Sequence, residues 1–172
     1  MDLAQSIRNI PDFPVKGIQF KDITTLLQDP TAFAAAVRAL LDHYANREID
    51  VVVGIEARGF IWGAIVAFER GAGFVPVRKP GKLPAETIRA EYSLEYGTNI
   101  LEMHHDAIRP GQRVLVIDDL LATGGTAKAT CDLVEMLGGQ VVGVAFLIEL
   151  ISLAGRAKLA GYDVWALIPM EG

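Results

Sequence analysis

The sequence is poor in three features that would indicate other classes of protein. It has one cysteine, Cys131, among 172 residues, so it cannot form an intramolecular disulfide, and we expect a reducing compartment. Its net charge of −5 is opposite in sign to that of most chains that bind nucleic acid along a phosphate stripe. No apolar run approaches the roughly 18 residues of a membrane span, and residues 1–5 do not begin a secretory signal. We therefore expect a cytoplasmic protein that binds neither nucleic acid nor membrane.

What the sequence does have is enough apolar material for a large core. Hydrophobic residues make up 51% of the chain and charged residues 22%, which excludes a disordered chain, and the length indicates one domain over residues 1–172. Near-continuous apolarity in short β-branched runs predicts strands covered on both faces, as in a parallel sheet. Four such runs are present: residues 49–55, 73–77, 113–117 and 141–148.

Helical segments alternate with these runs. Asp29-Pro30-Thr31 opens the first, the second covers residues 60–70 and ends at Gly71, and the third covers residues 126–137 before Gly138-Gly139. Gly past the end and Asp-Pro at the start are ordinary helix boundary signals. The alternation predicts an α/β fold with a doubly wound, mostly parallel sheet.

Two segments lie outside this pattern. Residues 1–30 are rich in turn-forming residues and form a small N-terminal hood in our interpretation. Residues 79–99 are long and polar; an excursion of that length between core strands favours a flexible flap, with a short hairpin at 87–94. Because ligands bind beyond the carboxyl ends of the strands in such sheets, functional residues should follow the strands directly.

The strongest functional signal is residues 114–126, VLVIDDLLATGGT. A buried strand ends in Asp118 and Asp119, and a loop of small residues then leads into a helix. Backbone N–H groups of such a loop, the helix N-terminus and the hydroxyls of Thr123 and Thr126 can hold a phosphate. Two carboxylates beside a phosphate would repel it unless a sugar diol lies between them. The string therefore predicts a sugar-phosphate site.

This string resembles the phosphoribosyl-diphosphate (PRPP) signature of the type I phosphoribosyltransferases. Other segments are similar to the adenine-specific members of that family, and with the signature they span about residues 10–150. The resemblance implies conversion of adenine and PRPP to AMP and diphosphate, with Mg²⁺ bound through PRPP rather than by the protein directly, in a homodimer. The other matching segments are GIQFKDIT (17–24), EARGF (56–60), VRKPGKLP (77–84) and YSLEYG (92–97).

The residues of these segments also have physical roles in such a reaction. The turn 56–59 follows a strand and precedes a helix, so it can form a second anion site with Arg58; in the family this turn often holds a strained or cis peptide. Phe20 can stack on a purine while the backbone of Gln19 and Lys21 reads its edge. Residues expected to bind PRPP are Ala57, Arg58, Arg78, Lys79, Lys82, Asp118, Asp119, Ala122, Thr123, Gly124, Gly125 and Thr126.

By resemblance, Glu95 is the general acid or base, acting with Arg58, and Tyr96 belongs to the same flap. The resemblance also implies that some of the basic residues at 78–82 reach the neighbouring subunit's site. We assign no role to His104 and His105, since adjacent strand residues point to opposite faces.

Two alternatives remain open. One is a phosphoribosyltransferase for another purine, such as xanthine or hypoxanthine; relatives of that kind hold the 6-oxo group with a lysine from a C-terminal strand, and residues 162–168 contain none. The other is a non-catalytic PRPP sensor. Trp62 and Trp165 are interpreted as core residues.

Overall fold

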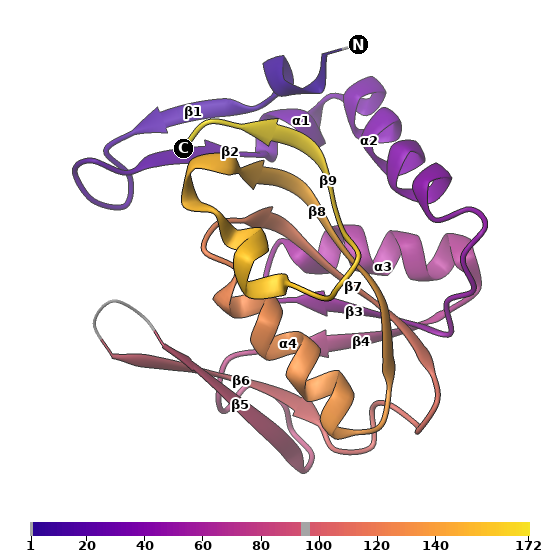
Figure 1. Cartoon of the computed structure of the whole chain (residues 1–172). Coiled ribbons are helices and arrows are strands. Elements are labelled where there is room, and N and C mark those ends of the chain that lie inside the picture. Colours follow the sequence, from indigo (N-terminus) through magenta and orange to yellow (C-terminus); the bar gives the residue numbers. More distant parts are fainter. Residues whose placement is uncertain (1, 94–96) are drawn as a thin grey trace.

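The computed structural model describes residues 2–93 and 97–172, and a five-stranded parallel sheet forms its centre (Figure 1). The strands lie in the order β4-β3-β7-β8-β9. Their bounds are β3 (Val51–Ile55), β4 (Gly73–Val77), β7 (Arg113–Leu121), β8 (Gln140–Leu150) and β9 (Val164–Met170). The chain leaves β3 for the sheet edge at β4 and returns on the other side of β3 at β7. The strand order therefore reverses between β3 and β7, where doubly wound sheets bind their ligands.

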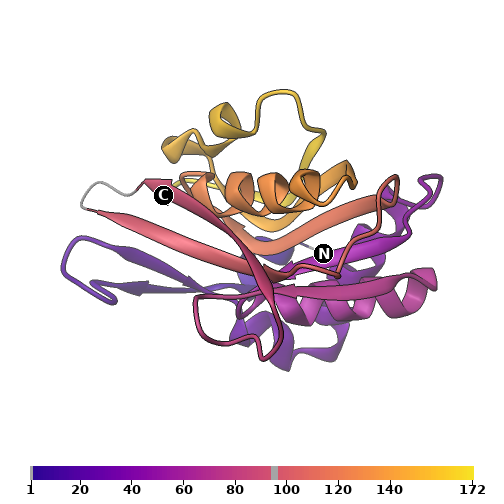
Figure 2. The same ribbon diagram turned by 90° about the horizontal axis from the view of Figure 1, so that it is seen from below.

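Helices cover both faces of the sheet, as the apolar runs predict. Helices α2 and α3 pack on one face, whereas α4 and the hairpin β5–β6 pack on the other (Figures 1 and 2). Successive side chains of β3 alternate between the two apolar clusters, so every residue of this strand is buried. The bounds are α2 (Pro30–His43), α3 (Gly59–Arg70), α4 (Gly125–Met136), β5 (Thr87–Ser93) and β6 (Thr98–His104). The doubly wound α/β prediction is thus confirmed.

The N-terminal segment contains regular structure that the sequence pattern did not predict. A 3₁₀ turn (Leu3–Ser6) leads into an antiparallel hairpin of β1 (Arg8–Pro11) and β2 (Gln19–Asp22), and α1 (Thr24–Gln28) follows. These strands are four residues long, and neither alternates between buried and exposed residues, so they lack the pattern that reveals longer strands. Asp22 anchors the hairpin: hydrogen bonds from Thr24 and Arg8 lower its pKa to about 2.

The predicted flap is a hairpin, and it is longer than expected. Strands β5 and β6 pair from Thr87↔His104 to Ser93↔Thr98, so the hairpin extends beyond residue 99; Leu94, where the expected short hairpin ended, lies outside the described residues. The β1–β2 and β5–β6 hairpins extend from the same side of the sheet in both views (Figures 1 and 2). They therefore flank the carboxyl ends of β3 and β7.

One strand boundary matters for the site. The sequence predicts a strand ending at residue 117, but β7 continues to Leu121 and still pairs with β8 there, at Leu121↔Glu149. Asp118 and Asp119 consequently lie within the strand rather than after it. The pattern of apolar residues could not show this, because the extension is held by backbone hydrogen bonds to a strand more than twenty residues away.

Several further residues are placed as the sequence suggested. Trp62 is fully buried, and Trp165 is half-buried, stacked on His43 with ring centres 4.5 Å apart. His104 accepts a hydrogen bond from the backbone N–H of Ala85. None of the described helices is both long and apolar enough to cross a membrane.

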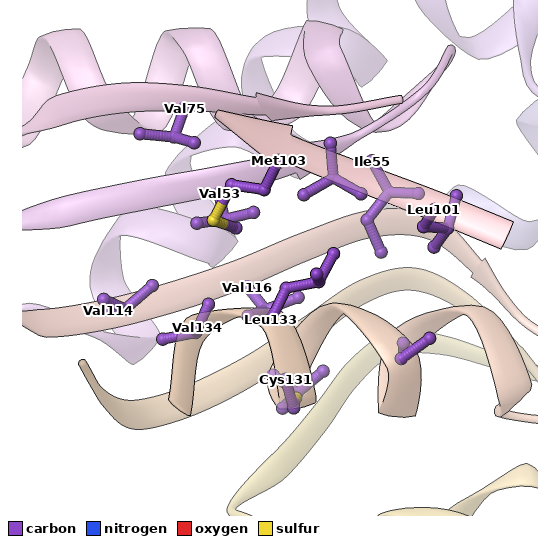
Figure 3. Packing of buried hydrophobic residues seen from close by; sticks show 14 of the residues in the cluster. Val53, Ile55, Val75, Leu101, Met103, Val114, Val116, Cys131, Leu133 and Val134 are labelled. Carbon is purple, nitrogen blue, oxygen red and sulfur yellow. The ribbon is translucent and has the colours of Figure 1, made fainter. Parts of the chain in front are cut away.

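The face of α4 turned toward the sheet should dominate stability. Leu133 is fully buried among Val53, Val114 and Val116 (Figure 3), whereas Met136, one turn away on the same helix, is 59% exposed. We expect Leu133→Ala to lower the free energy of unfolding by about 2–5 kcal/mol and Met136→Ala by less than about 0.5 kcal/mol, measured by urea denaturation. Equal losses in the two variants would contradict this packing.

Candidate active site

A cavity of about 450 Å³ lies at the carboxyl ends of β3 and β7. Residues 55–58 form one wall and residues 118–120 another. Lys79 from the loop after β4, Tyr92 from β5 and Thr126 from the first turn of α4 close the cavity. Its volume is typical of small-molecule sites, which are usually about 300–1,000 Å³. The reversal of strand order thus brings together turns that are far apart in the sequence.

Two adjacent carboxylates line this cavity and are held in different ways. Asp119 is 5% exposed and forms an ion pair with Arg58 Nε. Asp118 Oδ1 accepts a hydrogen bond of 2.8 Å from the backbone N–H of Asp119. Burial, together with the neighbouring charge of Asp119, raises the pKa of Asp118 well above its usual value. Asp118 is therefore a carboxylate that lacks enough donors, and hydroxyl groups of a ligand would supply them.

Both helices that begin at the cavity have open N-termini. The first turns of α3, after Arg58, and α4, after Gly124, receive no side-chain cap, whereas α2 is capped by Asp29 in the ordinary way. The first N–H groups of an uncapped helix need acceptors, and an anion is a favourable one. The cavity is thus flanked by two positions suited to phosphate groups.

The loop before α4 is shaped by a contact with a later part of the chain. Ala122, Gly124 and Thr126 line a smaller recess beside the cavity. Gly124 has φ +85°, and a Cβ there would lie 2.4 Å from the carbonyl oxygen of Gly155, while a Cβ on Gly155 would lie 2.3 Å from the carbonyl oxygen of Ala122. Only two glycines allow the backbones to approach so closely. The 3₁₀ turn Gly155–Leu159 therefore supports the loop.

The turn after β3 and the basic cluster meet through Glu56. The Glu56–Ala57 peptide is cis, in keeping with the family resemblance. Glu56 accepts 2.8 Å hydrogen bonds from Arg78 and from the backbone N–H of Lys79. Although burial raises its pKa, these bonds lower the pKa below its usual value. Of the basic cluster, Lys79 lines the cavity, Arg78 is held by Glu56, and Lys82 is exposed and does not line it.

The hood contacts the site through Phe20. The guanidinium carbon of Arg58 lies 5.5 Å from the centre of the Phe20 ring, and Phe13 packs edge-on against that ring at 5.1 Å. The neighbours of Phe20 are tied to β1: Asn9 donates to Gln19 (2.8 Å), and Lys21 donates to Asn9 (3.2 Å). The predicted base-binding residues thus adjoin the predicted diphosphate turn.

Some of the predicted and observed site residues do not coincide. Glu95 and Tyr96 lie outside the described residues. Sequence reasoning missed Glu56, Tyr92 and Gly155, which the structure brings to the cavity or its loop. Position alone could have identified Glu56, the first residue after a buried strand; the other two depend on contacts between distant segments, which leave no local signal.

The environments of the two aspartates predict opposite effects on stability. Because the pKa of Asp118 is raised in the folded state, its charge costs stability at neutral pH; that cost shrinks as the pH falls through the raised pKa and is gone below the usual aspartate pKa. We expect Asp118→Asn to raise the free energy of unfolding by about 0.5–2 kcal/mol at pH 7, with the gain shrinking toward pH 4. Asp119→Asn breaks the pair with Arg58 and should unfold at a lower temperature than Asp118→Asn. Thermal denaturation of both variants across pH measures this, and equal stability of the two at pH 7 would count against the assignment.

Comparisons with known proteins agree with this geometry. The family model "Phosphoribosyl transferase domain" matches residues 22–165. The adenine phosphoribosyltransferase of Chloroflexus aurantiacus is 62% identical over 97% of this chain and 96% of its own. The crystal structure of the Thermoanaerobacter pseudethanolicus adenine phosphoribosyltransferase superposes with a TM-score of 0.95, at 55% identity and 98% coverage of both chains.

A third relative has been crystallised with ligands. The Saccharomyces cerevisiae adenine phosphoribosyltransferase, complexed with an imino-altritol bisphosphate and adenine, is 39% identical with a TM-score of 0.89 and 96% coverage of both chains. The family match spans most of the chain, and relatives of the same name cover nearly all of it. The chain therefore belongs to the phosphoribosyltransferase family, and within it to the adenine phosphoribosyltransferases.

Proposed function

We propose that this chain transfers the 5-phosphoribosyl group of PRPP to N9 of adenine, releasing diphosphate and forming AMP, and that the residues lining the β3–β7 cavity carry out the reaction. The observation that carries the proposal is the pair of carboxylates, Asp118 and Asp119, set between two uncapped helix N-termini. The substrate PRPP has the complementary order: its hydroxyl groups can face the carboxylates, and a phosphate group on each side of the ribose can face a helix N-terminus. The ligands of the yeast relative, a sugar-like bisphosphate and adenine, support the same substrate classes.

Each part of PRPP has a complementary group. The 2′ and 3′ hydroxyls of the ribose donate to Asp118 and Asp119, which relieves the shortage of donors at Asp118. The 5′-phosphate accepts from the backbone of residues 122–126 and from the Thr123 and Thr126 hydroxyls. The diphosphate lies at the Ala57-Arg58 turn, where Lys79 and the other cations of the 78–82 segment add positive charge.

Arg58 links the binding of the three ligand parts. It is paired with Asp119 and lies over Phe20. It therefore occupies both the carboxylate proposed to bind the ribose and the ring proposed to stack on the base. A diphosphate at its own turn offers a stronger partner, with two negative oxygens for the guanidinium. Movement of Arg58 to the diphosphate frees Asp119 for the diol and Phe20 for adenine. PRPP binding therefore prepares the base site.

The base is held by stacking and by the backbone. Adenine stacks on Phe20, and the main-chain groups of Gln19 and Lys21 contact its edge. Glu95, from the flap, handles the proton of the attacking base, and closure of the flap excludes the water that would otherwise hydrolyse PRPP. Positive charge that develops at the anomeric carbon in the transition state faces Asp118 and Asp119.

Magnesium fits this site as a partner of the substrate. Mg²⁺ binds readily to substrate phosphates and keeps several of its waters, so PRPP itself can carry the ion into the site while Asp118 and Asp119 hold the diol; the described residues include no group of three or more side chains able to hold a metal. When bound, the ion neutralises charge on the leaving diphosphate. We also propose that the chain is one domain, with hood and flap as outlined, and works as a cytoplasmic homodimer.

The decisive experiment is an assay of AMP formation. Purified protein is incubated with PRPP, Mg²⁺ and one purine at a time: adenine, hypoxanthine, guanine or xanthine. We expect AMP from adenine and little product from the 6-oxopurines. The Asp118→Asn/Asp119→Asn double variant, folded by circular dichroism, should barely turn over. Faster reaction with a 6-oxopurine would overturn the base assignment, and PRPP binding without turnover would favour a sensor.

Phe20 should determine the affinity for the base. We expect Phe20→Ala to raise the KM for adenine about tenfold or more, since base–aromatic stacking is worth about 1–3 kcal/mol, and to leave the KM for PRPP nearly unchanged. Phe20→Tyr keeps the aromatic face and should keep the adenine KM close to wild type. Steady-state kinetics decides; an effect confined to PRPP would refute the stacking role.

Gly155 should determine the affinity for the phosphate. A methyl group at this position would lie 2.3 Å from the carbonyl oxygen of Ala122, so the loop must move. We expect Gly155→Ala to raise the KM for PRPP about tenfold, the scale of one charged hydrogen bond, with the adenine KM preserved. Ala157→Ser, in the same 3₁₀ turn and exposed, is the control. A Gly155→Ala protein with wild-type kinetics would show that the contact has no role in binding.

A further inference from the structure

Tyr92 occupies a position that the proposed reaction does not yet use. It lies on β5, half-buried, and lines the cavity together with Asp118 and Thr126. Its ring packs over the start of α4: a Cβ on Gly125 would lie 3.0 Å from its Cδ2 atom. Tyr92 thus touches the phosphate loop although it belongs to the flap hairpin.

The phenolic oxygen of Tyr92 joins two polar side chains. It accepts a hydrogen bond from Asn99 Nδ2, at 3.3 Å, and another from Thr126 Oγ1, also at 3.3 Å. Asn99 is the register partner of Tyr92 on β6, and Thr126 is in the first turn of α4. The three side chains therefore form a continuous series from the hairpin to the phosphate loop.

The chemistry of the two ends determines how protons must be arranged when a phosphate is bound. The Asn99 N–H group can only donate, and a phosphate oxygen can only accept. Each hydroxyl between them has one proton. When a phosphate oxygen accepts a hydrogen bond from the Thr126 hydroxyl, the Thr126 oxygen is left as an acceptor for Tyr92, and the Tyr92 O–H then donates to it. The series becomes Asn99 N–H to Tyr92, Tyr92 O–H to Thr126, and Thr126 O–H to phosphate.

Such an aligned series is stronger than its separate bonds. Hydrogen bonds that all run in one direction polarise one another. The distance from Thr126 Oγ1 to the Tyr92 oxygen exceeds the usual O–H···O length of about 2.7–2.8 Å, and the distance from Asn99 Nδ2 exceeds the usual N–H···O length of about 2.9–3.0 Å, so both contacts have room to shorten. Shortening them draws the end of the hairpin toward α4.

We propose that Asn99, Tyr92 and Thr126 form a hydrogen-bond relay that fastens the β5–β6 hairpin to the phosphate loop when a sugar phosphate is bound, with Tyr92 as its central positioning residue. The relay rests on the proposed function, because it requires the 5′-phosphate at residues 122–126. Its consequence is an order of events: the phosphate end of PRPP steadies the flap hairpin before the base arrives. The ligand that acts on the relay is a sugar phosphate, with or without the diphosphate.

The test uses ribose 5-phosphate, which carries the phosphate but cannot react. Hydrogen–deuterium exchange of the intact protein is followed in two regions, residues 122–130 for binding and residues 87–93 with 98–104 for the hairpin. In the wild type, we expect ribose 5-phosphate to slow exchange in both regions. In Tyr92→Phe, we expect protection of the loop, with a Kd about three- to tenfold weaker, and no protection of the hairpin.

A matched control removes a different phenol hydroxyl that also reaches α4. Tyr162 donates a 2.9 Å hydrogen bond to Glu135 near the far end of that helix. Tyr162→Phe should keep both the Kd for ribose 5-phosphate and the protection of the hairpin. In a double-mutant cycle, Tyr92→Phe should cost little in a Thr126→Val background, because the relay is already interrupted.

The outcomes separate the relay from the function it rests on. Protection of the hairpin in Tyr92→Phe equal to that in the wild type overturns the relay and leaves the phosphate site intact. Additive losses of affinity in the double-mutant cycle also overturn it. Absence of protection at residues 122–130 in the wild type at millimolar ribose 5-phosphate overturns the phosphate site, and the relay with it.

Discussion

The structure depends on keeping two neighbouring carboxylates at the end of a buried strand. Asp118 and Asp119 repel each other, and burial makes each charge costly. Asp119 is compensated by Arg58, whereas Asp118 keeps a raised pKa. The protein thus holds one carboxylate in a state that a diol would improve. Two uncapped helix N-termini and a cluster of cations supply positive charge on either side of the carboxylates. Positive and negative regions therefore alternate along the site, although the chain as a whole is acidic.

The parallel sheet makes this arrangement possible. Parallel strands end together, and the reversal of strand order between β3 and β7 leaves a crevice that no crossing connection fills. The turn with Arg58 and the strand with the aspartates are about sixty residues apart in the sequence, yet they face one another there. Each turn leads into a helix that has no side-chain cap at its N-terminus. The two anion positions and the sugar position that we propose are therefore consequences of topology as well as of individual side chains.

The features that could be predicted from the sequence are those determined by residues close together along the chain. The buried strands, the helices with clear Asp-Pro and Gly boundaries, and the string around Asp118 carry their own patterns, and the family resemblance assigned them an activity. Contacts between distant segments could not be predicted, because they produce no periodic pattern in the sequence. Examples are the contacts of Glu56 with Arg78, of Tyr92 with Thr126, and of Gly155 with Gly124. The β1–β2 hairpin was missed because its strands are short and do not alternate between buried and exposed residues. The end of β7 was misplaced because pairing with β8 extends that strand.

The contact between Gly124 and Gly155 has a consequence for the order in which the protein is made. The ribosome completes Arg58, both aspartates and the phosphate loop well before it adds the 3₁₀ turn that supports the loop. A nascent chain, or one cleaved before residue 155, holds all the side chains proposed to bind PRPP but lacks the surface against which the loop takes its shape. Synthesis of the chain from residue 155 onward is thus what turns a set of suitable residues into a binding site.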